Sequence, residues 1–174
     1  PITVIGNVTT ATDGSAVQAD VSFRKVTTVP GIPDVVVTTA TATATAGPDT
    51  LPTAYGVTVA SAETYEVDVQ PTGDSAAIFP PIHETVAVPG DYDFFRHEFV
   101  YPATFTKLQG TLVDSDGKPQ SNLLVRAYDT TTGRPISTRV LSGLGNVPGA
   151  FELTFAQAPS PYVIRISASS ERPT

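Results

Sequence analysis

The chain has 174 residues, a formal charge of −7 from 10 Lys+Arg and 17 Asp+Glu, and neither cysteine nor methionine. The lack of cysteine excludes a disulfide framework, a thiol nucleophile and a thiolate-ligated zinc site, and the few basic residues argue against a nucleic-acid partner, because phosphates are bound by basic surfaces. No apolar run approaches the roughly 20 residues of a membrane-spanning helix, so we expect no membrane span in this segment.

The composition favours an all-β protein. Threonine, valine, glycine and proline are abundant and helix formers are scarce, which is typical of short strands joined by turns. In chain order, we expect a strand over residues 2–8, a turn at Asp13-Gly14 and a strand over residues 17–23, where apolar residues occupy every second position. Residues 35–46 end in Thr-Ala alternation and are predicted to form a long hairpin arm.

The rest of the first half is also predicted to form strands. Residues 55–59 and 65–69 alternate apolar and polar positions on either side of a short turn. Residues 78–88 contain Pro80-Pro81, which indicates edge or irregular structure. A stretch rich in aromatic residues, 92–101, ends this half.

The second half repeats the first. The recurring sequences are Gly6-Asn7-Val8 with Asp13-Gly14, matched by Gly110-Thr111-Leu112 with Asp116-Gly117, and Tyr55-Gly56-Val57 with Tyr65-Glu66-Val67, matched by Phe151-Glu152-Leu153 with Tyr162-Val163-Ile164. The offset between equivalent residues shrinks slowly and only at loops, where changes in length cost little stability. We therefore predict two domains, residues 1–104 and residues 105–174.

The second copy is the shorter one. Copy one continues to residue 104 after its strand at 65–69, whereas copy two ends at Thr174, soon after the equivalent strand. Two explanations are open: missing sequence accounts for the difference, or a strand from another chain completes the copy, because an exposed sheet edge readily accepts one. The second explanation describes a fibre subunit that assembles by strand exchange.

Copy two also shows a recognisable order of turns and strands. Its elements are Gly110, Leu112, Asp114, Asp116-Gly117-Lys118-Pro119 and Val125, then Phe151-Glu152-Leu153 and Tyr162-Val163-Ile164. This order resembles that of the carboxypeptidase regulatory-like domains, which share a transthyretin-like β-sandwich. Copy one departs from it with Ser15-Ala16 where Lys-Pro is usual. Collagen-adhesin B-type repeats share part of the pattern, but no asparagine follows Asn146 to form their isopeptide bond with Lys107.

The resemblance implies an all-β fold of two tandem antiparallel β-sandwich domains, transthyretin-like or with an immunoglobulin-like Greek key. It implies a non-catalytic structural or binding module of an exported or cell-surface bacterial protein, with a spacer, adhesive or scaffold role and an extracellular, periplasmic or cell-surface location. We expect a monomer without a cofactor, whose partners are other domains of the parent chain or a cell-surface polysaccharide. The alternatives are a carbohydrate-binding module and the fibre subunit.

The aromatic stretch supplies the candidate binding residues, because side chains on a strand alternate between two faces. One face, which we expect to pack inward, carries Phe95, His97, Phe99 and Tyr101. The other face carries Tyr92, Phe94, Arg96, Glu98 and Val100. Exposed aromatic rings can stack on sugars, and the surface candidates are Tyr92, Phe94, Arg96 and, at the end of the stretch, Tyr101.

Other polar residues give weaker signals for chemistry. Asp114 and Asp116 precede a glycine as calcium ligands do, but the later acids of a calcium loop are missing and Asp-Gly is typical of hairpin turns. The two histidines occur in the pairs His83-Glu84 and His97-Glu98, which could supply metal ligands. A zinc site needs at least three convergent ligands, and no third one has a diagnostic spacing. No Gly-x-Ser-x-Gly sequence is present, although a glycosidase-like carboxylate pair stays open, because its separation is spatial. We expect no catalytic residues.

Overall fold

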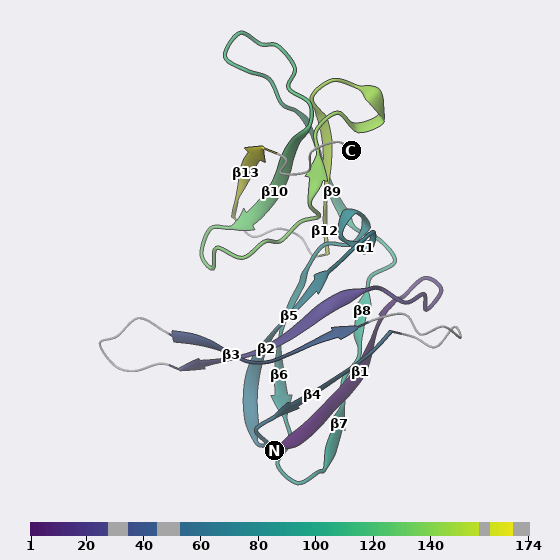
Figure 1. Ribbon diagram of the computed structural model, residues 1–174, viewed down its shortest axis with the longest axis vertical. Coiled ribbons are helices and arrows are strands. Elements are labelled where there is room, and N and C mark those ends of the chain that lie inside the picture. The colour runs from purple at the N-terminus through teal and green to yellow at the C-terminus, as the bar shows by residue number, and fades with distance from the viewer. Residues whose placement is uncertain (28–34, 45–52, 157–160, 169–174) are drawn as a thin grey trace. The chain divides into compact units, whose positions relative to one another are not determined.

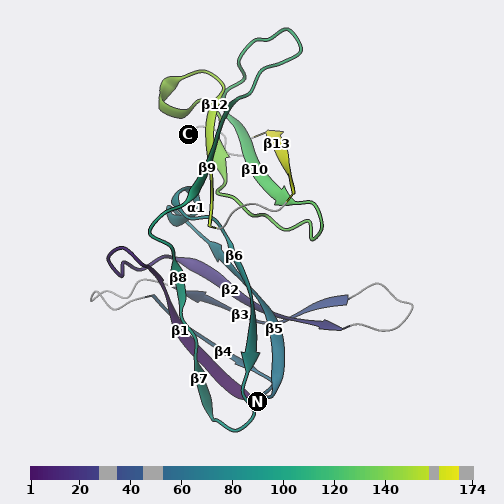
Figure 2. The same ribbon diagram turned by 180° about the vertical axis from the view of Figure 1, so that it is seen from behind.

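The computed structural model describes residues 1–27, 35–44, 53–156 and 161–168 and consists mostly of β-strands in several sheets (Figures 1 and 2). The all-β prediction is confirmed. Within these residues the helices are the short α1 (Ser75–Ile78) and the 3-10 turn η1 (Leu144–Asn146). No helix in this part of the chain is long and apolar enough to cross a membrane.

The chain divides into two compact units. Unit 1 comprises Pro1–Ser75 and Ile82–Ala103, and unit 2 comprises Ala76–Pro81 and Thr104–Thr174. The segment Ala76–Pro81 comes from the first copy of the sequence repeat but groups with unit 2, where the rings of Phe79 and Phe105 lie 6.2 Å apart between centroids.

The first sheet of unit 1 is organised around β1 (Ile2–Thr10). β4 (Thr53–Val59) pairs with β1 in antiparallel fashion, while β7 (Phe94–Arg96) and β8 (Phe99–Tyr101) pair with it in parallel. Alternate residues of β1 are buried, which is the period-two pattern of a strand that covers a core on one face. Residues from the two ends of unit 1 therefore meet in one sheet.

The second sheet of unit 1 has the strand order β3-β2-β5-β6. Its members are β3 (Val35–Ala44), β2 (Ala19–Thr27), β5 (Glu63–Pro71) and β6 (Ile82–Val88), and all neighbours are antiparallel. The predicted Thr-Ala arm is an integral strand of this sheet, since β3 pairs with β2 along its length and Ala44 is fully buried. Residues 45–46 of that arm lie outside the described part of the chain.

The two sheets of unit 1 share one core. Phe23 of β2 has its ring centroid 6.4 Å from that of Tyr55 on β4 and 5.9 Å from that of Tyr65 on β5. The Tyr55 ring lies a further 5.5 Å from Phe99 of β8. Because all four residues are at most 4% exposed, these rings form the centre of the apolar interior that stabilises the unit.

Unit 2 repeats part of this arrangement. β9 (Thr106–Thr111) pairs with β12 (Ala150–Phe155), and β10 (Leu123–Asp129) lies between β11 (Val140–Leu141) and β13 (Tyr162–Ala168), all antiparallel. The core comes from β10 and β12 and consists of Val125, Ala127, Phe151, Leu153 and Phe155. Side chains from both sheets therefore pack together in unit 2 as well.

Each unit contains the same glycine–aromatic pair. Gly6 on β1 lies opposite Tyr55 on β4, and Gly110 on β9 lies opposite Phe151 on β12. A Cβ atom at Gly110 would lie 2.6 Å from the Phe151 ring, and one at Gly6 would lie 1.6 Å from the backbone oxygen of His97. Close approach of a ring or a backbone requires glycine at both positions. Glycine therefore recurs at both positions because neither has room for a side chain, with His97 the nearest neighbour in unit 1 and Phe151 in unit 2.

The turn after the first strand of each unit also recurs. Gly14 and Gly117 have positive φ angles of 71° and 78°, which glycine adopts without steric cost. The first turn is one residue longer, because the N–H of Gly14 donates to the carbonyl of Thr10 whereas that of Gly117 donates to the carbonyl of Asp114. The slow drift of the sequence repeat thus has a structural counterpart in this turn.

Candidate functional site

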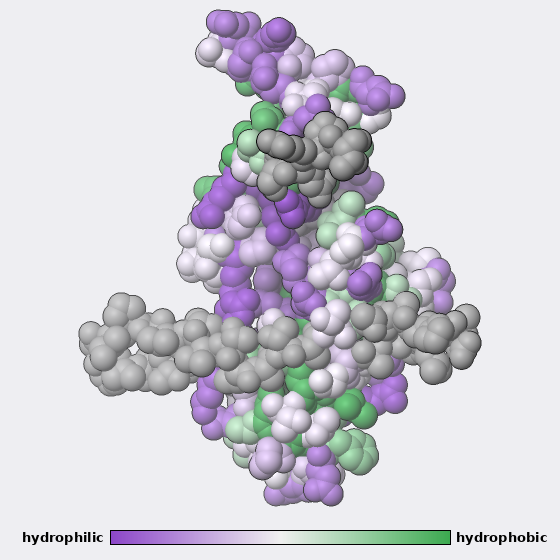
Figure 3. Space-filling model, viewed as in Figure 1, coloured by the Kyte–Doolittle hydropathy of each residue, from purple (hydrophilic) through white to green (hydrophobic). Residues whose placement is uncertain are grey.

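The surface of unit 1 around β7 contains an open hollow of about 510 Å³. It is lined by Ala87, Val88, Pro89, Tyr92, Phe94, Phe95 and Arg96. Tyr92 and Phe94 are 67% and 65% exposed, so a ligand can reach both rings. In Figure 3, hydrophobic residues gather on the surface of unit 1 in the area where Figure 1 draws β1, β4 and β7.

Strand alternation places these side chains. Phe94 and Arg96 are exposed, Phe95 between them is half-buried, and the series continues inward with half-buried His97 and buried Phe99. The predicted division of residues 92–101 into two faces is confirmed. Three of the four predicted surface residues, Tyr92, Phe94 and Arg96, line this hollow together.

Tyr101 does not belong to this surface. It is 0% exposed, and burial raises the pKa of its hydroxyl above the ordinary range. Val100 next to it is half exposed, so the alternation of β8 turns Tyr101 into the core. The prediction of Tyr101 as a surface residue is wrong, because it lies on the inward face with Phe99.

Arg96 also lines a second hollow, of about 310 Å³. The other residues that line it are Ile5, Gly6, Asn7 and Tyr55. Nε of Arg96 donates to Oε1 of Glu98 at 2.5 Å, and Oε2 of Glu98 accepts the backbone N–H of Asn7 at 2.8 Å. Glu98 thus orients an arginine whose side chain stays 67% exposed, and this cation is shared by both hollows.

His97 lies between β7 and β8, and its contacts fix the position of the chain there. Its Nε2 lies 2.5 Å from Oε1 of Glu84, and its backbone carbonyl accepts a hydrogen bond from the Tyr55 hydroxyl at 2.8 Å. Burial raises the pKa of Tyr55 above the ordinary range, and the nearby Glu98 and Glu84 raise it further. Tyr55 therefore stays a neutral hydrogen-bond donor that fixes the backbone beside the smaller hollow.

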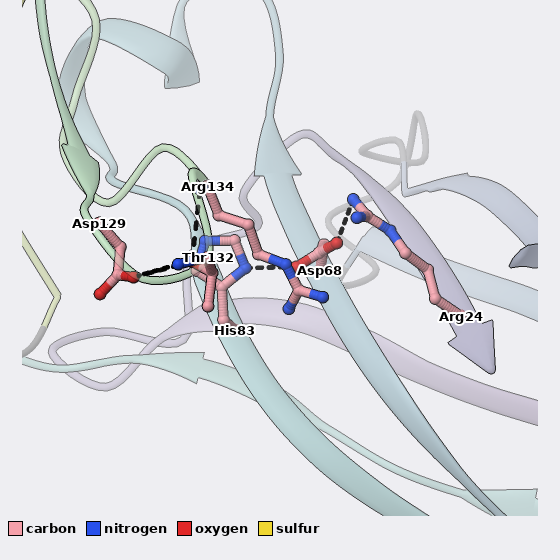
Figure 4. Close-up of polar contacts among 6 residues, drawn as sticks. All are labelled: Arg24, Asp68, His83, Asp129, Thr132 and Arg134. Carbon is pink, nitrogen blue, oxygen red and sulfur yellow. Dashed lines mark hydrogen bonds and ion pairs between the residues drawn. The ribbon is translucent and has the colours of Figure 1, made fainter. Parts of the chain in front are cut away.

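His83 belongs to a different cluster, which Figure 4 shows. The carboxylate of Asp68 on β5 is ion-paired with Arg24 of β2 and contacts Nδ1 of His83 on β6. Asp68 is 5% exposed, and these contacts link three neighbouring strands of one sheet. The figure also draws a turn of unit 2, where the Asp129 carboxylate accepts the N–H of Thr132 at 2.7 Å. The first arrangement joins the side chains of three strands, and the second holds the backbone of a turn.

The calcium candidates Asp114 and Asp116 form a turn. Oδ1 of Asp114 accepts the backbone N–H groups of Asp116 and Lys118 at 3.0 and 2.8 Å. Its Oδ2 accepts Nε2 of Gln120 at 2.8 Å. Both carboxylate oxygens thus bind donors of the turn itself, which is the usual role of aspartate at such a position.

Comparison with known proteins does not narrow the choice of function for this site. No protein-family model, curated protein or solved structure matches the chain. Among the residues that the structure describes, no three His, Cys, Asp or Glu side chains gather so that they could hold a metal ion. The two hollows that share Arg96 are therefore the features of unit 1 that bear on its function.

Sequence reasoning missed several parts of this site. Ala87 and Val88 at the end of β6, and Pro89 directly after it, form part of the larger hollow. Glu98 was predicted to share a strand face with Arg96 but not to orient it. A signal for the smaller hollow was present in the repeat, since the recurring glycine–aromatic pair includes two of its lining residues, Gly6 and Tyr55.

Proposed function

We propose that the chain is a non-catalytic structural and binding module in which the hollow around Tyr92, Phe94 and Arg96 is an adhesive surface. The observation that carries this proposal is the exposure of two aromatic rings, 67% and 65%, in one hollow. Contiguous exposed apolar surface on a soluble domain is typical of a binding site. Aromatic residues and arginine are also the side chains most enriched at such sites.

We further propose that each unit is a β-sandwich of the transthyretin-like kind, related to the carboxypeptidase regulatory-like domains. The ring contacts between Phe23 and Tyr55 across two sheets support this fold for unit 1, and the core formed by β10 and β12 supports it for unit 2. The resemblance of the sequence to those domains is the reason for proposing an exported or cell-surface bacterial parent protein.

A carbohydrate is the ligand class that the hollow favours. Sugar rings stack on exposed aromatic faces, and the arginine beside them donates hydrogen bonds to hydroxyl or carboxylate groups. Because Arg96 lines both hollows, an elongated ligand such as a cell-surface polysaccharide can contact both. This makes a carbohydrate-binding module the second candidate function, nested within the adhesive role.

Isothermal titration of the full chain with soluble bacterial polysaccharides and their oligosaccharides tests the proposal. We expect Tyr92→Ala and Phe94→Ala each to weaken binding by about tenfold, since an aromatic stacking contact contributes roughly 0.5–1.5 kcal/mol beyond buried area. Tyr92→Phe keeps the ring and retains binding, and Val100→Ala on β8 is the matched surface control. Absence of affinity for the polysaccharides overturns the carbohydrate assignment, and equal effects of Tyr92→Ala and Val100→Ala overturn the hollow as the site.

A further inference from the structure

The last strand of unit 2, β13, corresponds to β5 of unit 1. The equivalent cross-strand pairs are Val69 with Val21 and Val67 with Phe23 in unit 1, and Ile166 with Val125 and Ile164 with Ala127 in unit 2. The first residue of each pair lies on β5 or β13, and the second lies on the neighbouring strand, β2 or β10. The two strands therefore have the same register on one side.

The other sides of these strands differ. β5 pairs with β6 from Glu63 opposite Val88 to Val69 opposite Ile82. Among the described residues, no strand pairs with the far side of β13, and both ribbon views draw it at the edge of its sheet (Figures 1 and 2). Within the described residues, unit 2 therefore presents an unpaired edge of seven residues on the side where unit 1 has the seven-residue strand β6.

The side chains at this edge are exposed although their counterparts are buried. Val67 and Val69 are 0% exposed, whereas Ile164 and Ile166 are 37% and 51% exposed. Figure 3 shows hydrophobic surface over the part of unit 2 where Figure 1 draws β13. An uncovered apolar face of this kind loses the stabilisation of about 25 cal/mol per Å² that burial would provide.

The edge has few of the features that usually prevent strand pairing. Natural edge strands carry charged side chains, above all lysine, or proline, a bulge or a short length. β13 contains neither lysine nor proline, its only charged residue is Arg165, and its pairing with β10 runs without a register shift from Tyr162 to Ala168. Its N–H and C=O groups on the free side can therefore pair with an added strand.

The charge at the centre of this edge indicates what kind of strand fits. Arg165 occupies the place that Asp68 has in unit 1, so the charge is inverted. Asp68 contacts Arg24 on one neighbouring strand and His83 on the other. Arg165 lies over the Tyr128 ring at 4.4 Å on its one neighbour. The place equivalent to His83 is where a carboxylate would pair with Arg165.

The net charges of the two units also favour an acidic partner for unit 2. Unit 1 contains 3 Lys+Arg and 12 Asp+Glu, a formal charge of −9, whereas unit 2 contains 7 Lys+Arg and 5 Asp+Glu, a formal charge of +2. A second copy of β13 would bring another Arg165 to the edge. An acidic segment of a different polypeptide is favoured by the sign of unit 2 as a whole.

We propose that the free edge of β13 is a receptor for an extended segment of a partner polypeptide. The segment adds antiparallel to β13 in the register of β6, with apolar side chains beside Ile164 and Ile166 and an acidic side chain opposite Arg165. It completes the sheet of unit 2 by β-strand addition, in which backbone hydrogen bonds provide affinity and alternate side chains provide specificity. This interaction is independent of the hollow on unit 1.

Two synthetic peptides test the proposal with the full chain. The first has the sequence of β6 with His83→Asp and Glu84→Val, which places the acid opposite Arg165 and an apolar residue beside Ile164 in the proposed register. The second is identical but carries His83→Lys. We expect NMR shift changes confined to residues 160–168 and their neighbours on β10, with about three- to tenfold weaker binding of the lysine peptide.

The variant Arg165→Glu is the matched control for charge, with its circular dichroism compared to that of the parent chain. We expect it to reverse the preference between the two peptides. Shift changes elsewhere, absence of binding by both peptides, or an unchanged preference in Arg165→Glu overturn the proposal. Concentration-dependent sedimentation with protection of β13 amides in the absence of peptide also overturns it, since the occupant would then be a second copy. The variant Tyr92→Ala leaves peptide binding unchanged, which separates this edge from the hollow.

Discussion

Unit 1 and unit 2 pair their central strands in the same way and differ in what covers those strands. In unit 1, β1 has β4 on one side and β7 with β8 on the other, and β5 has β6 beyond it. In the described part of unit 2, β9 has only β12, the equivalent of β4, beside it. β13 has only β10, the equivalent of β2, beside it. The same residue pattern thus gives a buried face in one unit and an exposed face in the other.

Alternation in the sequence predicts which residues share a face of a strand but not whether that face is buried. Ile164 and Ile166 alternate as regularly as Val67 and Val69, yet their exposure differs by at least 37 percentage points because the neighbouring strand differs. Burial is a property of the assembled sheets, to which several distant segments contribute. Substitutions at equivalent positions should therefore have unequal effects in the two units.

Among the substitutions considered, a side chain added at Gly6 should lower the stability most, because Gly6 lies against both His97 and Tyr55. Gly6→Ala should destabilise unit 1 by at least about 3 kcal/mol, because the added Cβ meets the backbone of His97, which cannot rotate away. Gly110→Ala should cost less, about 1–2 kcal/mol, because the Phe151 ring it meets can tilt. Urea denaturation followed by circular dichroism measures both, and hydrogen exchange assigns each loss to its unit.

Gly56→Ala is the control for these two variants. Gly56 lies on β4 of the same sheet as Gly6, and an added Cβ would meet only a methyl group of Ile5 at 3.8 Å. We expect an unchanged or slightly increased stability, because alanine restricts the unfolded chain more than glycine does. A loss at Gly56 as large as that at Gly6 would show that the strand tolerates no Cβ for another reason.

The second largest loss of stability is expected at Asp68, whose equivalent in unit 2 is the oppositely charged Arg165. Asp68→Asn should destabilise unit 1 by about 2 kcal/mol, because it leaves the partly buried Arg24 without its carboxylate. Glu63→Gln on the same strand should cost at most about 1 kcal/mol, since its pair with Lys25 is exposed to solvent. Arg165→Gln, at the place equivalent to Asp68, should have a similarly small effect. Thermal unfolding of the three variants ranks them, and equal losses would contradict the comparison.

A third, smaller difference is expected in the apolar faces themselves. Val67→Ala removes two methyl groups from a fully buried site and should cost about 2 kcal/mol. Ile164→Ala removes more carbon atoms but should cost less than about 1 kcal/mol, because the side chain is already 37% exposed. Chemical denaturation with both variants checks the order. If Ile164→Ala were the more damaging change, β13 would be covered in solution by something already present.

The smallest effect is a pH dependence in the first Asp-Gly turn. Hydrogen bonds from Thr10 and Ser15 lower the pKa of Asp13 from 3.8 to about 2. A carboxylate whose folded pKa is depressed contributes stability that is present above about pH 4 and is lost as the pH falls toward 2. Asp13→Asn should therefore flatten the stability profile in that window only. Identical profiles for the variant and the parent chain, measured by urea titration at each pH, would contradict this.

The strands, and which of their residues share a face, were predictable because both depend on local alternation. Tyr92 and Phe94 were predicted to face outward with Arg96, and the structure places them there. The parallel pairing of β7 and β8 with β1 was not predictable, since no local signal specifies which distant strand a short segment joins. The contacts of Asp68 were missed for the same reason, because three strands must be aligned before its partners meet.

The central position of β1 also has a consequence for the order of synthesis. β1 precedes every other strand of unit 1 in the chain, but its first partner is β4 and its last, β8, ends at Tyr101. A growing polypeptide therefore carries β1 with both edges unpaired until β4 has been synthesised, and with one edge unpaired until almost the whole unit has left the ribosome. β2 and β3 meet as chain neighbours much earlier. An unpaired strand of this kind is prone to aggregation, so β1 is where a nascent chain would most need a chaperone.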